Sequence, residues 1–188
     1  MQLMKLIRTI LPRTRLNVRH ISEGRRFVAA DVLWIGDISR DDLVFASTKM
    51  GSEYLAETSA KPVFPVDGII YDQVYGRRII NLIVGFKNKT ISVPFLMDSG
   101  CPMTTIGTET MIALGINAND VFKMHLNVHG FESIPFSHDP DDKKIRDLNL
   151  LGWEFFRDTK AHEDVDLEGR KVTLFKSKAD MLAFYNGK

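Results

Sequence analysis

One carboxylate in this sequence directly follows a predicted core strand, so it is expected at the edge of the folded core. The apolar run Phe95–Met97 precedes Asp98, and Ser99 and Gly100 follow it. A carboxylate in such a place is poorly hydrated, so it needs partners, and a second carboxylate sharing the site would shift its pKa. The Ser99 hydroxyl can hydrogen-bond nearby backbone and hold the loop. Gly100 lacks a Cβ, which permits a tight turn or the close approach of a substrate backbone.

A predicted β-hairpin positions this carboxylate. The segments Ile79–Phe86 and Thr90–Met97 are rich in residues that favour strands, and the polar stretch Lys87–Lys89 between them predicts a turn. The second strand runs directly into Asp98.

The remainder of the chain from residue 108 alternates short predicted strands with small helices. Strands are predicted at Val121–His129, Phe131–Ser137, Ile145–Leu151, Val165–Leu167 and Lys171–Phe175, and helices at Thr108–Leu114, Trp153–Asp158 and Ala179–Tyr185. Many short strands separated by turns indicate an all-β, barrel-like domain with only small helices.

With these neighbours, Asp98–Gly100 resembles the active-site motif of the retropepsin-like aspartic proteases, the single-domain, retroviral type. In that family a small residue follows the glycine and a Ser or Thr stands three positions later, here Cys101 and Thr104. The family's second motif, an apolar pair before a glycine and a short helix, is similar to Leu148–Phe156. The resemblance covers Arg77–Phe175 and implies an all-β fold, a closed barrel-like acid-protease domain with short helices.

The resemblance also implies an activity, that of an aspartic endopeptidase with Asp98, Ser99 and Gly100 as its catalytic residues. Two aspartates, one from each subunit, would share one proton because two carboxylates so close cannot both ionise. One would take a proton from water and the other would protonate the scissile carbonyl. Because the chain holds a single Asp-Ser/Thr-Gly, a homodimer acting on a peptide or protein substrate is expected, with no metal and no cofactor.

The family covers its site with a β-hairpin flap, and this chain leaves little room for one. Either the flap is reduced to Ile116–Lys123, or it is Asn127–Ile134 with Gly130 at its tip. A truncated flap would weaken substrate clamping and water exclusion. The alternative function is therefore a catalytically inactive retropepsin-like module for dimerisation or peptide binding. A third reading is an unrelated β-barrel in which Asp98 is structural.

Three other features have alternative interpretations. Cys101 is either a small buried hydrophobic residue or a redox-sensitive thiol beside Asp98. Trp153, with the phenylalanines of its predicted helix, either packs into the core or forms a partner-binding patch. His125 and His129 are four residues apart, a zinc-like spacing only on a helix, whereas their segment is predicted to be a strand.

Composition excludes several classes of protein. Hydrophobic residues make up 44% and charged residues 26% of the chain, as in globular proteins rather than disordered or membrane ones. The net charge of +1 offers no basic stripe for nucleic acid. No apolar run has the length of a membrane span. A lone cysteine cannot form an internal disulfide, which indicates an intracellular protein.

The 188 residues divide into four predicted parts. Residues 1–22 carry five Lys or Arg and no acidic residue, the pattern of a mitochondrial transit peptide; the alternative is a basic N-terminal arm of a cytoplasmic protein. Residues 23–76 form an N-terminal extension of uncertain structure, with a predicted strand at Phe27–Ile35 and a linker at Lys61–Pro65. Residues 77–175 are the protease-like domain, and residues 176–188 a C-terminal helical tail.

Overall fold

The computed structural model describes residues 38–71, 76–119, 122–139, 141–142 and 146–187. The predicted basic arm or transit peptide at residues 1–22 and the strand predicted at Phe27–Ile35 lie outside the described residues. None of the helices in the described ranges is long and apolar enough to cross a membrane.

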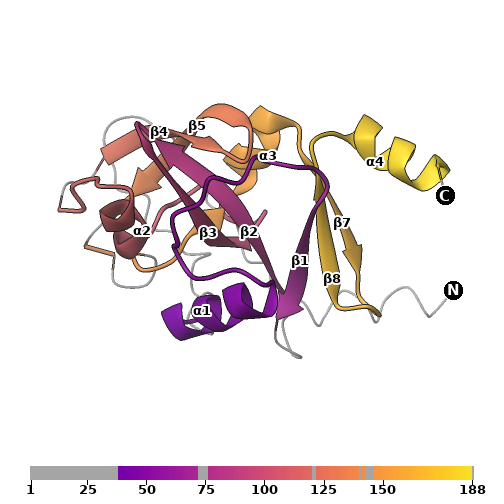
Figure 1. The fold of residues 1–188 in the computed structure, drawn as a ribbon, viewed down its shortest axis with the longest axis horizontal. Coiled ribbons are helices and arrows are strands. Elements are labelled where there is room, and N and C mark those ends of the chain that lie inside the picture. The colour runs from indigo at the N-terminus through magenta and orange to yellow at the C-terminus, as the bar shows by residue number, and fades with distance from the viewer. Residues whose placement is uncertain (1–37, 72–75, 120–121, 140, 143–145, 188) are drawn as a thin grey trace, which may run out of the picture.

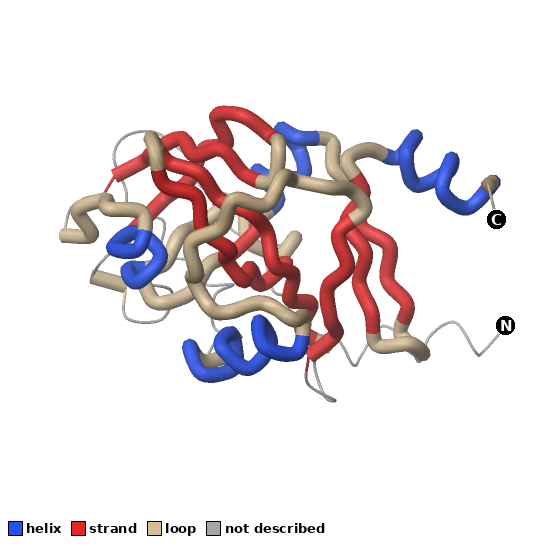
Figure 2. Tube along the Cα trace, in the orientation of Figure 1, coloured by secondary structure: helices blue, strands red, loops and turns tan. Residues whose placement is uncertain are grey.

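The described part of the chain is mostly β: eight strands form one largely antiparallel sheet with four short helices around it (Figure 1, Figure 2). The strands are β1 Val66–Tyr71, β2 Arg77–Phe86, β3 Lys89–Met97, β4 Phe122–Val128, β5 Phe131–His138, β6 Leu150–Leu151, β7 His162–Asp166 and β8 Lys171–Phe175. The helices are α1 Arg40–Lys49, α2 Thr108–Ala113, α3 Trp153–Thr159 and α4 Lys178–Asn186.

The long strand β2 organises the sheet. Along its whole length one edge pairs with β3, from Arg78 opposite Met97 to Phe86 opposite Lys89. The other edge is divided, because β1 pairs with its first residues and β4 pairs with Val84 and Gly85 near its end.

The expectation of a closed barrel is wrong. The strand order is β5-β4-β2-β1-β8-β7, and the outer strands β5 and β7 are not paired with each other. The physical reason is the divided edge of β2, from which β4–β5 and β1–β8–β7 leave as two separate arms. Figure 1 shows these arms on opposite sides of β2.

Apolar residues cover both faces of the β2–β3 hairpin, as the period-2 alternation of a strand allows. On one face Ile80 and Phe95 belong to the main core, which also contains Phe136 and Phe155. On the other face Ile79 and Leu96 pack in a second cluster with Leu43 and Ala46 of α1. Because β3 is buried on both faces, its sequence is a nearly continuous apolar run up to Asp98.

Most predicted elements are confirmed, whereas one strand and one helix differ from the prediction. The hairpin of β2 and β3, the helix α3 and the C-terminal helix α4 lie where the sequence predicts them. The strand predicted at Ile145–Leu151 begins outside the described residues, and in its described part only Leu150–Leu151 form a strand, β6. The helix α1 was not predicted, although Ser39 and Asp42 form a capping box at its start.

Candidate functional site

Asp98 immediately follows β3, inside a tight turn. Its backbone N–H donates to the carbonyl of Leu151 at 3.0 Å, which continues the parallel pairing of β3 with β6. The Cys101 N–H donates to the Asp98 carbonyl at 3.0 Å, and the Gly100 N–H donates to Asp98 Oδ1 at 3.1 Å. The turn therefore fixes both the position and the orientation of the carboxylate.

The three predicted catalytic residues lie together, but the carboxylate is less enclosed than expected. Asp98 is partly exposed, and Ser99 and Gly100 are exposed. Among the described residues the Ser99 hydroxyl has no hydrogen-bond partner, so its role in holding the loop stays a prediction. The Gly100 amide does hold the loop, through its bond to Asp98 Oδ1. In the chain as described, no second carboxylate hydrogen-bonds to Asp98.

The two predicted motifs meet in space. The Gly152 N–H donates to Thr104 Oγ1 at 3.3 Å, and the Trp153 N–H donates to the Cys101 carbonyl at 2.7 Å. A Cβ on Gly152 would lie 2.0 Å from the Met103 carbonyl oxygen, so this position requires glycine. Residues about fifty positions apart in the sequence are thus hydrogen-bonded to each other next to the Asp98 turn.

Asn149 is a structural residue of the site that the sequence reasoning missed. It is fully buried. Its Oδ1 accepts from the Gly107 N–H at 2.9 Å and from Thr110 Oγ1 at 2.8 Å, and its Nδ2 donates to the Pro94 carbonyl at 3.2 Å. The side chain therefore joins β3 to the start of α2. A lone amide within the apolar run from Leu148 to Leu151 was the available signal, because a buried polar group needs partners.

Cys101 is a small buried residue rather than an exposed thiol. It packs in the second core cluster, and its Sγ–H donates to the Met103 carbonyl at 3.2 Å. Burial raises the pKa of this thiol, and the negative charge of Asp98 adds to the effect. Both features disfavour a reactive thiolate, which supports the first of the two interpretations.

The hairpin β4–β5 has its tip at His129 and Gly130, which have φ values of 45° and 85°. The His129 N–H donates to the Ile83 carbonyl at 2.6 Å, and β2–β3 pairing places Ile83 opposite Ser92. Ser92 lies six residues before Asp98, a distance of about 20 Å along a strand. The second flap assignment, Asn127–Ile134, is therefore wrong, because this tip is remote from Asp98.

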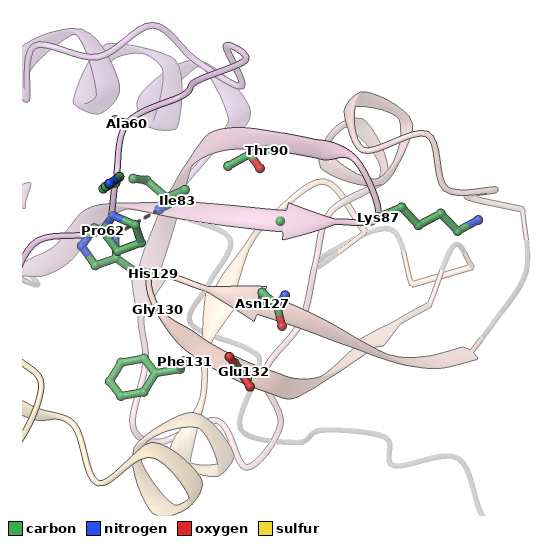
Figure 3. Close-up of a pocket in the computed structure, with 12 residues that line it drawn as sticks. Ala60, Pro62, Ile83, Lys87, Thr90, Asn127, His129, Gly130, Phe131 and Glu132 are labelled. Carbon is green, nitrogen blue, oxygen red and sulfur yellow. Dashed lines mark hydrogen bonds between the residues drawn. The ribbon is translucent and has the colours of Figure 1, made fainter.

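Instead, the tip closes against the segment Lys61–Pro65. His129 Nε2–H donates to the Val63 carbonyl at 3.0 Å, and its Nδ1 accepts from the Ile83 N–H at 3.3 Å. Figure 3 shows His129 near Pro62, with its bond to Ile83, beside a cavity of about 340 Å³ that Pro62, Gly130 and Glu132 help to line. The first flap assignment, Ile116–Lys123, lies partly outside the described residues and stays a prediction.

His125 and His129, whose spacing would be zinc-like only on a helix, do not form a metal site with other described residues. His125 is exposed on β4, whereas both ring nitrogens of His129 bond to backbone groups. Within the described ranges, no group of three or more His, Cys, Asp or Glu residues is arranged to hold a metal ion.

Comparison with known proteins yields structural likeness but no family-model match and no significant curated match. Among solved structures, the chain is similar to a retropepsin-like aspartic protease from Rickettsia conorii, with a TM-score of 0.43 and 20% sequence identity. The alignment covers 58% of this chain and 90% of that one.

Proposed function

We propose that this chain is an aspartic endopeptidase whose catalytic dyad is completed by a second copy of itself. The observation that carries the proposal is the Asp98 turn, in which one carboxylate is oriented by a backbone amide and left accessible to solvent. A dyad needs two carboxylates close enough to share a proton. Since no second carboxylate meets Asp98 within the described part of one chain, the other is assigned to a partner.

In the proposed mechanism a water molecule lies between the two Asp98 side chains. The ionised carboxylate takes a proton from this water, and the water oxygen attacks the carbonyl carbon of the scissile bond. The protonated carboxylate gives its proton to the carbonyl oxygen, which produces a neutral tetrahedral intermediate. The C–N bond then breaks: the leaving amine takes a proton from the first carboxylate, and a hydroxyl of the intermediate returns its proton to the second carboxylate, which restores the singly protonated dyad. The open face of Gly100 leaves room for the substrate backbone beside the dyad.

Cleavage of a diverse peptide library between pH 4 and 7 tests this proposal. Wild type, Asp98→Asn and the matched control Glu168→Gln would be compared, since Glu168 is an exposed carboxylate in the β7–β8 turn. We expect Asp98→Asn to abolish cleavage while sedimentation velocity still shows a dimer, and we expect the control to cleave as wild type does. Cleavage retained by Asp98→Asn, or an active monomer, would refute the dyad.

A second function, a non-catalytic module for dimerisation or peptide binding, is favoured by one observation. The β4–β5 hairpin is engaged with Lys61–Pro65 at the far end of β2 and does not cover Asp98. A site without a cover excludes water poorly. A well-folded dimer that cleaves no peptide in either the wild-type or the Asp98→Asn form would support this function.

A further inference from the structure

An exposed tryptophan stands next to the Asp98 turn. Trp153 is the first residue of α3, and 56% of its surface is exposed. Its N–H is bonded to the Cys101 carbonyl, and Cys101 is bonded through its own N–H to the Asp98 carbonyl. A turn of this kind spans less than about 7 Å and a hydrogen-bonded backbone pair about 5.5 Å, which places the Cα atoms of Trp153 and Asp98 within roughly 13 Å.

The core does not account for this side chain. Phe155 of the same helix is fully buried and packs edge-on against Phe131, and Phe156 is partly buried against the main core. The expectation that the aromatic residues of α3 pack into the core therefore holds for these two and is wrong for Trp153. A large indole left in water beside a candidate site is characteristic of interface anchors, in which tryptophan is enriched.

The geometry of a shared dyad indicates which molecule would contact Trp153, namely a second copy of the chain. If two Asp98 carboxylates share a proton, a two-fold axis passes between them, so exposed groups next to Asp98 lie beside the other copy. The exposed residues of the turn, Ser99, Gly100 and Pro102, are uncharged. The charged groups of α3 are paired internally, since Arg157 bonds to Asp158 at 2.6 Å and contacts Glu154 at 3.6 Å. Two copies of this surface therefore meet without opposing unpaired like charges.

We propose that Trp153 is an anchor of the homodimer interface, where its indole packs against the Ser99–Pro102 loop of a second copy. This inference rests on the proposed function, because the shared dyad requires the second copy. In a two-fold interface each copy contributes one indole, so removal of the side chain deletes two anchors at once. We expect Trp153→Ala to raise the dimer dissociation constant by at least about 100-fold.

Sedimentation equilibrium of the full chain measures this effect. Wild type and Trp153→Ala would be compared with Ile112→Ala, which removes a 62%-exposed apolar side chain from α2. The expected result is weaker dimerisation for Trp153→Ala alone. A dissociation constant within threefold of wild type would overturn the inference. An unchanged dissociation constant with a raised KM would also overturn it, because the indole would then contact substrate.

A second measurement leaves Trp153 intact. The chain has two tryptophans, so Trp34→Phe makes Trp153 the sole indole emitter. Its emission should shift to shorter wavelengths as concentration rises through the dissociation constant, and an emission independent of dimerisation would contradict the inference. The proposed function and this inference can fail separately. If dimerisation depends on Trp153 but nothing is cleaved, catalysis alone is refuted. If cleavage depends on Asp98 but dimerisation does not depend on Trp153, the proposed interface alone is refuted. A chain that is monomeric at every concentration refutes both.

Discussion

The glycine beneath the Asp98 turn offers the sharpest test of the site. In Gly152→Ala the new Cβ would lie 2.0 Å from the Met103 carbonyl oxygen, 2.5 Å from its carbonyl carbon and 2.8 Å from the Cys101 carbonyl oxygen. All three atoms belong to backbone, so no side chain can rotate away. The loop that carries Asp98 must move by more than an ångström to restore van der Waals contact.

The cost of this movement has two parts. Displacing the loop breaks the hydrogen bonds from Gly152 N–H to Thr104 Oγ1 and from Trp153 N–H to the Cys101 carbonyl, each worth about 1 kcal/mol. Overpacking in a closed core adds about 1 to 3 kcal/mol. We therefore expect Gly152→Ala to lower the free energy of unfolding by about 3 to 5 kcal/mol, a large fraction of the stability of a small domain.

Urea denaturation followed by circular dichroism measures this change, and Gly85→Ala is the matched control. Gly85 lies in β2, and the atoms nearest to a Cβ there are 3.7 to 3.9 Å away, an ordinary contact. Replacing a strand glycine whose new Cβ makes only ordinary contacts should leave stability unchanged or raise it by about 0.5 to 1 kcal/mol. If Gly152→Ala unfolds within 1 kcal/mol of wild type, the close packing of Gly152 against the loop is refuted.

Two further substitutions test the supports around the site. Asn149→Leu leaves the buried Gly107 N–H and Thr110 hydroxyl without their acceptor. The free energy of unfolding should therefore fall by about 3 kcal/mol or more. A loss below about 1 kcal/mol in urea titration would contradict the hydrogen-bond network of Asn149. For His129, burial lowers the pKa below the ordinary 6.5, so the unfolded chain takes up this proton at a higher pH than the folded chain. The free energy of unfolding should therefore be highest above pH 7 and fall as pH decreases through 6.5 toward the folded-state pKa, by at most about 1.4 kcal/mol per pH unit for one proton. Below that pKa this contribution no longer changes with pH. His129→Gln should remove this part of the pH dependence, and an unchanged profile in denaturation from pH 8 to 5 would show that another group causes it.

Much of the local structure could be predicted from the sequence. The apolar runs on either side of Lys87–Lys89 predict the β2–β3 hairpin, and the run into Asp98 predicts where the carboxylate lies along the chain. The apolar pair before Gly152 predicts the start of α3. These signals are local, because strand and helix patterns depend on residues a few positions apart.

Only the tertiary structure determined which strands pair along the same edge and which distant residues come into contact. Nothing in the sequence shows that β1 and β4 divide one edge of β2, and that division leaves the sheet open rather than closed. Only the folded chain brings Thr104 to Gly152, and only there does Trp153 stay exposed while Phe155 is buried. The physical reason is that edge pairing and burial are set by contacts between residues far apart in sequence, whereas the period of a strand or helix is written in neighbouring residues.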